Sequence, residues 1–198
     1  RQMCIRDSNN RGAYMKKQKR ILFTYLLTCI LIFISSSATS AGTLSVNRVE
    51  QAKSNWCWAA AAEMVGTYNT TSNLRQYEIV YYFYGESYPD VAGNVNQIAT
   101  GINYSSNYTK SAYVSNFFTL SSIKSNIDKA HPFVIRLAWN SGGGHAVACA
   151  GYSGSSIYVI DPWPGISNRY YPYDMLLSGG SFACLLYTSP SPRDTERC

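Results

Sequence analysis

The spacing of apolar residues changes along this chain, from helical in the first part to alternating in the second. A helix is predicted over 119–130, because Leu120, Ile123 and Ile127 recur at helical spacing and Pro132 forbids its continuation. Beyond Pro132, strands separated by Gly- and Ser-rich turns are predicted over 133–139, 146–152, 157–160 and 169–173. Helices followed by a small antiparallel sheet make α+β the expected fold class.

The upstream part of the chain gives weaker helical signals. Residues 58–65 are rich in Ala, Glu and Met, which favour helix. The segment 74–84 is compatible with helix or strand, because its apolar spacing decides neither. A short helix is predicted over 94–102, and the Tyr-, Ser- and Asn-rich segment that follows it is predicted to be a loop as far as Val114.

Cys57 stands at the start of the helix predicted over 58–65. Ser54 or Asn55 can cap this helix through a side-chain oxygen. In the first turn of a helix, the positive end of the dipole favours a thiolate over a thiol. Gln51 lies six residues upstream, close enough to fold back and offer its amide to a group that Cys57 attacks.

A base for Cys57 has to come from one of two histidines. His145 follows three glycines at the start of a predicted strand, and Asp161 ends the next strand sixteen residues later. Two adjacent antiparallel strands would place these side chains next to each other. Each also has a simpler interpretation, as a strand-end histidine with one hydrogen bond and a turn aspartate before a proline. The other histidine, His131, is interpreted as a capping or surface residue.

The order and spacing of these residues together resemble the papain-like cysteine peptidases. The pattern consists of Gln51, Cys57 followed by Trp58, a late Gly-His-Ala at His145, and Asp161 with Trp163 two residues beyond. The resemblance covers 51 to about 177 and is greatest to compact bacterial branches, the effector-type and bacteriocin-leader-processing peptidases. It implies a papain-like fold whose N-terminal helical part carries the nucleophile, with Trp58 as a supporting residue.

The resemblance also implies a role for each residue. Cys57 would be the nucleophile, His145 the base and later the acid, and Asp161 the group that orients the imidazole. Gln51 and the backbone N–H of Cys57 would form the oxyanion hole, and Trp163 would shield the His–Asp bond from water. Ser-Asn-Trp precedes Cys57 in place of the Gly-Ser or Gly-Ala of plant and lysosomal members, so their specificity does not transfer.

The net charge of +6 is concentrated at the N-terminus: 1–41 carries seven basic residues against one acidic, and 42–184 eight of each. A neutral domain shows no electrostatic footprint for nucleic acid. From Met15, a basic start, an apolar run of about fourteen residues and a small-residue exit with Ala38 and Ala41 as cleavage positions are typical of a secretory signal peptide. A retained anchor is disfavoured, because a membrane span needs about twenty residues. A secreted or periplasmic protein without stable membrane association after cleavage is expected.

The sequence predicts four segments: a non-native leader over 1–14, the signal peptide over 15–41, the peptidase domain over 42–186, and a tail over 187–198. Both ends resemble translated sequencing adapter. For the Ser-Pro-Ser-Pro stretch of the tail, a short disordered segment is the alternative.

Three of the six cysteines, Cys57, Cys149 and Cys184, lie in the predicted domain, so at least one thiol is free. With two histidines and no Cys-x-x-Cys pair, neither a metal nor a cofactor is expected. The expected function is an exported cysteine peptidase that acts on a protein or peptide substrate through a thioester. Two alternatives stay open: a cysteine amidase or acyltransferase on peptidoglycan or other acyl substrates, and a non-catalytic secreted binding domain of the same fold.

Overall fold

The structure is a computed structural model that describes Met15 and residues 17–20, 40–115, 119–139, 143–178 and 182–192. The chain divides into two units, 1–39 and 40–198. In the first unit, Met15 and 17–20 are helical, while the predicted leader and most of the predicted signal peptide fall outside the described residues. Among the residues that the structure describes, none of the helices combines the length and apolarity that a membrane span needs.

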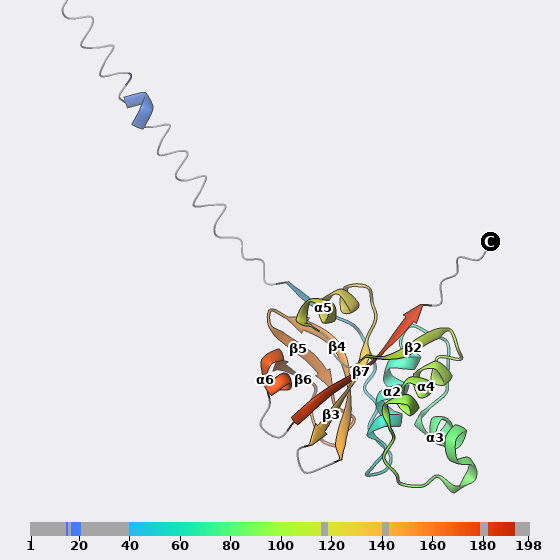
Figure 1. Ribbon diagram of the computed structural model, residues 1–198. Coiled ribbons are helices and arrows are strands. Elements are labelled where there is room, and N and C mark those ends of the chain that lie inside the picture. The colour runs from blue at the N-terminus through green and yellow to red at the C-terminus, as the bar shows by residue number, and fades with distance from the viewer. Residues whose placement is uncertain are drawn as a thin grey trace, which may run out of the picture. The chain divides into compact units, whose positions relative to one another are not determined.

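The second unit contains helices and an antiparallel sheet (Figure 1). Its helices are α2 (Cys57–Thr67), α3 (Gln76–Tyr84), the 3-10 helix η1 (Gly85–Ser87), α4 (Val95–Ser105), α5 (Leu120–Asp128) and α6 (Tyr173–Ser178). Its strands are β1 (Ala41–Thr43), β2 (Lys110–Ser115), β3 (Phe133–Trp139), β4 (Gly144–Ser153), β5 (Ser156–Ile160), β6 (Arg169–Pro172) and β7 (Phe182–Pro192). This confirms the mixed α and antiparallel β class.

The strands follow the order β2-β7-β3-β4-β5-β6, with β1 pairing to β4, and every pair is antiparallel. β3 has the bounds predicted for it, because Pro132 precedes a short run that is apolar except for Arg136. In the β3–β4 ladder, Leu137 lies opposite His145. The pairing of β4 with β5 brings the end of β5 towards the start of β4, which positions the candidate base and its partner.

Each face of β4 belongs to a different hydrophobic core. Ala146, Ala148 and Ala150 form one core with α2, and their small side chains allow the helix to pack closely against the sheet. Val147 and Cys149 point to the other face and pack in a second core with residues of α5. Because α2 packs directly on β4, its N-terminus is held near the strand whose second residue is His145.

The structure differs from the predicted element order. The segment 74–84, left open between helix and strand, is a helix from Gln76, and β2 occupies part of the predicted loop ending at Val114. β1 precedes the helices, and α6 separates the last two strands, so the order is not simply helices and then sheet. β7 continues to Pro192, beyond the predicted domain end at 186, and its residues from 187 onward pair with β2. The predicted tail therefore contributes to the sheet as far as Pro192.

Candidate active site

Cys57 is the first residue of α2 and is half-buried. The expected side-chain cap is absent: Trp56 occupies the N-cap position, and no side chain caps the helix. Asn55 instead bonds to Asp90, through its backbone N to Oδ1 at 2.7 Å and its Nδ2 to the backbone oxygen at 3.0 Å. The prediction that Ser54 or Asn55 caps α2 was therefore wrong, since Asn55 belongs to a contact between loops. At the first position of a helix, a backbone N–H has no acceptor within the helix, so that of Cys57 is available to a ligand.

His145 and Asp161 meet as the predicted strand pairing requires. Nε2 of His145 lies 2.7 Å from Oδ1 of Asp161, which also accepts a bond of 2.8 Å from the backbone N of Trp163. Because Nε2 is bonded to Asp161, Nδ1 is the ring nitrogen that can face Cys57. Gly144 has a structural reason to lack a side chain, because a Cβ there would lie 2.2 Å from the backbone oxygen of Leu137.

The electrostatics of the pair favour a charged imidazole. Burial acts to lower the pKa of His145, but its hydrogen bonds to Asp161 and Cys57, and the charges of these partners, outweigh burial and raise the pKa to about 9. For Asp161, burial acts to raise the pKa, but the bonds from His145 and from the Trp163 backbone lower it overall. The imidazole is thus bonded to the Asp161 carboxylate and is influenced electrostatically by Cys57.

The two tryptophans differ in their surroundings. The ring of Trp163 packs edge-on to the imidazole of His145, with centroids 6.1 Å apart, and remains half-exposed. Trp58 is fully buried, donates from Nε1 to the backbone oxygen of Val91 at 3.1 Å and packs so tightly on Gly93 that a Cβ there would meet its ring at 2.3 Å. Trp163 therefore covers one side of the His145 ring, whereas Trp58 fixes the loop beside the nucleophile helix.

Gln51 is buried, but its amide is already engaged. Nε2 donates to the backbone oxygens of Lys53 at 2.9 Å and Ser54 at 2.8 Å, while Oε1 has no partner among the described residues. Both hydrogens of the side-chain amide are thus bonded to carbonyls of the loop that leads to Cys57. Its role as an oxyanion donor stays a prediction, because one of these hydrogens has to turn towards the substrate.

A buried polar network that the sequence analysis missed holds the loop before Cys57. The side chain of Gln76 accepts from the backbone N of Ala52 and donates to the backbone oxygen of Glu50, both at 2.8 Å. Its own backbone N donates to Oε2 of Glu63, a buried residue of α2, at 2.8 Å. Burial raises the pKa of Glu63, and the Gln76 N–H and Arg75 offset this only partly. The network fastens residues 50–52 to the helix that begins with Cys57.

The other cysteine whose side chain is described is unsuited to nucleophilic catalysis. Cys149 is fully buried in the second core, and burial raises the pKa of its thiol to about 12. Within the described ranges, no group of three or more His, Cys, Asp or Glu side chains gathers where a metal ion could bind. Of these two cysteines, Cys57 is therefore the candidate nucleophile.

Two hollows adjoin the His–Asp pair. One of about 340 Å³ is open to solvent and is lined by His145, Asp161, Trp163, Arg169 and Tyr171 among others. The other, of about 90 Å³, is almost wholly apolar and lies between the pair and α6. The pair thus borders both a hollow that is open to solvent and a smaller, largely apolar one.

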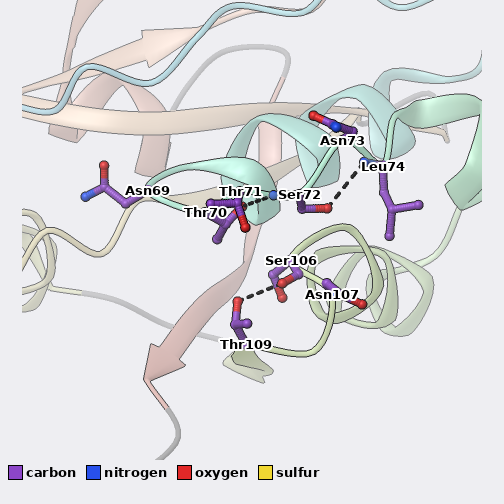
Figure 2. A pocket seen from close by; sticks show the side chains of 9 residues that line it. All are labelled: Asn69, Thr70, Thr71, Ser72, Asn73, Leu74, Ser106, Asn107 and Thr109. Carbon is purple, nitrogen blue, oxygen red and sulfur yellow. Dashed lines mark hydrogen bonds between the residues drawn. The ribbon is translucent and has the colours of Figure 1, made fainter.

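A larger hollow of about 570 Å³ touches none of the predicted site residues. It lies between the loop after α2 and the turn after α4, and is lined almost entirely by Asn, Ser and Thr (Figure 2). Several of its hydroxyls hold the loops themselves: Thr70 accepts from Ser72, Ser72 accepts from Leu74, and Thr109 donates to Ser106. Although this hollow is larger, the candidate active site is the one around His145, where an imidazole and a carboxylate are in contact.

Comparison with known families identifies the protein class. The model of a family described as "Peptidase_C39 like family" matches residues 43–181, which include Cys57, His145 and Asp161. The chain belongs to this family. C39-like peptidases are papain-like cysteine peptidases, so the protein is a cysteine peptidase. No protein among the curated sequences matches the chain.

Solved structures show the same fold at low sequence identity. A C39-like peptidase from Bacillus anthracis aligns with a TM-score of 0.56 and 15% identity, over 78% of this chain and 98% of that one. The peptidase domain of Streptococcus ComA, a bi-functional ABC transporter, gives 0.54 and 13%, over 74% and 99%. A double-glycine-motif protease from an AMS/PCAT transporter, in complex with the leader peptide, gives 0.52 and 19%, over 76% and 95%. The resemblance to leader-processing peptidases is confirmed at the level of fold.

Proposed function

We propose that this C39-like peptidase hydrolyses peptide bonds with Cys57 as nucleophile, His145 as general base and acid, and Asp161 as the group that orients the imidazole. The observation that carries the proposal is the position of His145, whose Nε2 is bonded to Asp161 at 2.7 Å while the ring also interacts with Cys57. A nucleophile, a base and an orienting carboxylate in this order are the parts that acyl transfer through a thiol requires.

The chemistry follows from the two ring nitrogens. Nδ1 of His145 takes the proton of the Cys57 thiol, and the sulfur attacks the substrate carbonyl. As the tetrahedral intermediate collapses, the C–N bond breaks and the imidazolium gives its proton to the leaving amine. Water then attacks the thioester with His145 again as the base, which releases the carboxylic acid and restores the thiol. Asp161 keeps Nε2 protonated, so that Nδ1 is the basic nitrogen at each step.

The developing oxyanion needs donors next to Cys57. The backbone N–H of Cys57 at the start of α2 supplies one, assisted by the positive end of the helix dipole. The amide of Gln51 is the proposed second donor. It requires one N–H to leave the loop carbonyl of Lys53 or Ser54 that it bonds in this structure.

We propose a peptide or protein as the substrate and an export route for the enzyme. The hollow beside Trp163 adjoins His145, the proposed base, and a solved structure of the same fold is a protease in complex with a leader peptide. The segment 15–41 has the basic, apolar and small-residue order of a signal peptide, which supports a secreted or periplasmic location without stable membrane association after cleavage.

A peptide library and an epoxysuccinyl thiol probe test the proposal together. The wild-type protein should cleave a subset of peptides and carry the probe on Cys57, while Cys57→Ala should lose both and unfold within about 1 kcal/mol of wild type. The buried Cys149 serves as the internal control for labelling, because its thiol should stay unmodified. Peptide cleavage that survives in Cys57→Ala would place the nucleophile elsewhere.

A further inference from the structure

The turn that carries Asp161 is bonded by a segment of chain more than a hundred residues upstream. Nε of Arg48 donates to the backbone oxygen of Asp161 at 3.0 Å, and Nη2 donates to that of Trp163 at 2.8 Å. Between them, the backbone N of Gln51 donates to the oxygen of Pro162 at 2.8 Å. Three successive carbonyls of one turn are thus all satisfied by residues 48–51.

The guanidinium of Arg48 is suited to this role by its shape. Its donors form a rigid planar fork, so the two bonds to Asp161 and Trp163 fix the distance between the ends of the turn. The remaining terminal nitrogen, Nη1, pairs with Glu50 at 2.6 Å, which restrains the fork from the side of its own segment. The exposed Glu50 pair alone would contribute little to stability.

The same turn supplies the bonds that aim Asp161. Oδ1 accepts from Nε2 of His145 and from the backbone N of Trp163, so the position of the carboxylate depends on the backbone at both ends of the turn. Arg48 holds both of these ends through their carbonyls. A shift of the turn would therefore move the acceptor away from the imidazole without any change in His145 or Asp161 themselves.

We propose that Arg48 is a positioning residue of this peptidase, which holds the Asp161–Trp163 turn so that the carboxylate orients His145 towards Cys57. The proposal rests on the catalytic roles proposed for His145 and Asp161. It assigns Arg48 no contact with the substrate. Arg48 acts through the backbone of the turn and, secondarily, through a positive charge that helps to keep Asp161 ionised.

The test needs a readout that does not depend on knowing the substrate. Alkylation of Cys57 by iodoacetamide, followed by mass spectrometry of the Cys57 peptide over about pH 5 to 9, reports the pairing of the thiol with His145. Arg48→Gln should slow alkylation at the acid end by about ten- to a hundredfold, the scale of a misplacement by about 1 Å. Arg48→Lys keeps the charge but has no fork, so it should recover only part of the rate.

Two comparisons decide whether Arg48 acts through Asp161. Arg48→Gln combined with Asp161→Asn should alkylate no more slowly than Asp161→Asn alone, because the turn then has no carboxylate to position. Lys124→Gln, which removes a cation of α5 that lies 5.4 Å from the centroid of the Tyr152 ring, is the control and should leave the pH profile unchanged. Additive effects of the Arg48 and Asp161 changes, or equal effects of Arg48→Gln and Lys124→Gln, would overturn the proposal.

The same data separate this inference from the proposed function. If Asp161→Asn leaves the alkylation profile of Cys57 unchanged, the proposed triad fails and the role of Arg48 fails with it. If Asp161→Asn alters the profile and Arg48→Gln does not, the triad stands and the inference alone is wrong. If thermal unfolding shows that Arg48→Gln does not fold, Arg48→Lys is tested in its place. An alkylation profile of Arg48→Lys identical to that of the wild type would then overturn the proposal.

Discussion

The free energy of unfolding should depend on pH through His145. Because its folded-state pKa is raised from 6.5 to about 9, the protonated imidazole stabilises the folded protein. That contribution is complete below pH 6.5, is lost progressively as the pH rises towards 9, and is absent above it. At 1.36 kcal/mol for each pKa unit, the rise corresponds to at most about 3 kcal/mol.

Urea unfolding at about pH 6 and about pH 10, compared between wild type and His145→Gln, isolates this contribution. Tyr and Lys side chains, and the Cys149 thiol, which burial keeps protonated in the folded state, titrate alike in both proteins and cancel in the comparison. Between the two pH values, we expect the free energy of unfolding of the wild type to fall by up to about 3 kcal/mol more than that of His145→Gln.

The partners of His145 provide the controls. Asp161→Asn and Cys57→Ala each remove groups whose charge or hydrogen bond raises the pKa of His145, so each should reduce the pH-dependent loss. Equal losses in wild type and His145→Gln would show that the imidazole is not stabilised in its charged form, and the electrostatic argument would then be refuted.

Two further predictions test the oxyanion hole and the C-terminal strand. Gln51→Ala should lower kcat by roughly 10²–10³ with little change in KM, the scale of one lost oxyanion donor; a rise in KM alone would show that Gln51 binds substrate instead. A chain that ends at Leu186 loses every residue of β7 that pairs with β2, so amide hydrogen exchange should become faster in β2 and the protein less stable. Unchanged exchange in β2 would show that 187–192 lies outside the fold, as the sequence predicted.

The sequence predicted best the elements that local signals bound on both sides. β3 lies between Pro132 and a glycine-rich stretch of sequence, and α5 begins after Thr119, whose hydroxyl accepts from the backbone N of Ser122 at 3.1 Å. The contact of His145 with Asp161 was predictable for the same reason, since two adjacent strands and a short turn bring the residues together. These features can be predicted from the local sequence pattern and from the pairing of strands that are neighbours in sequence.

The features that the sequence did not predict depend on partners far along the chain. β2 pairs with β7, more than seventy residues away, and its own sequence has little apolar alternation. Asn55 bonds to Asp90 rather than capping α2, so a tertiary contact overrides the local preference. The role of Arg48 could not be predicted, because its acceptors are backbone carbonyls, which every residue has. The residues around Arg48 also show no periodicity that would single it out.

The pairing of β1 with β4 bears on the export route proposed above. Ala41 is the first residue of β1, and the preceding Ser40 accepts from the backbone N of Gly154 and bonds the Tyr152 hydroxyl at 2.9 Å. In the proposed export route, removal of the signal peptide after Ala38 would leave all these bonds in place, whereas removal after Ala41 would delete them. Once the strand has paired with β4, the backbone at the later position is no longer accessible to a peptidase. Folding itself would then select the earlier cut and define the mature N-terminus.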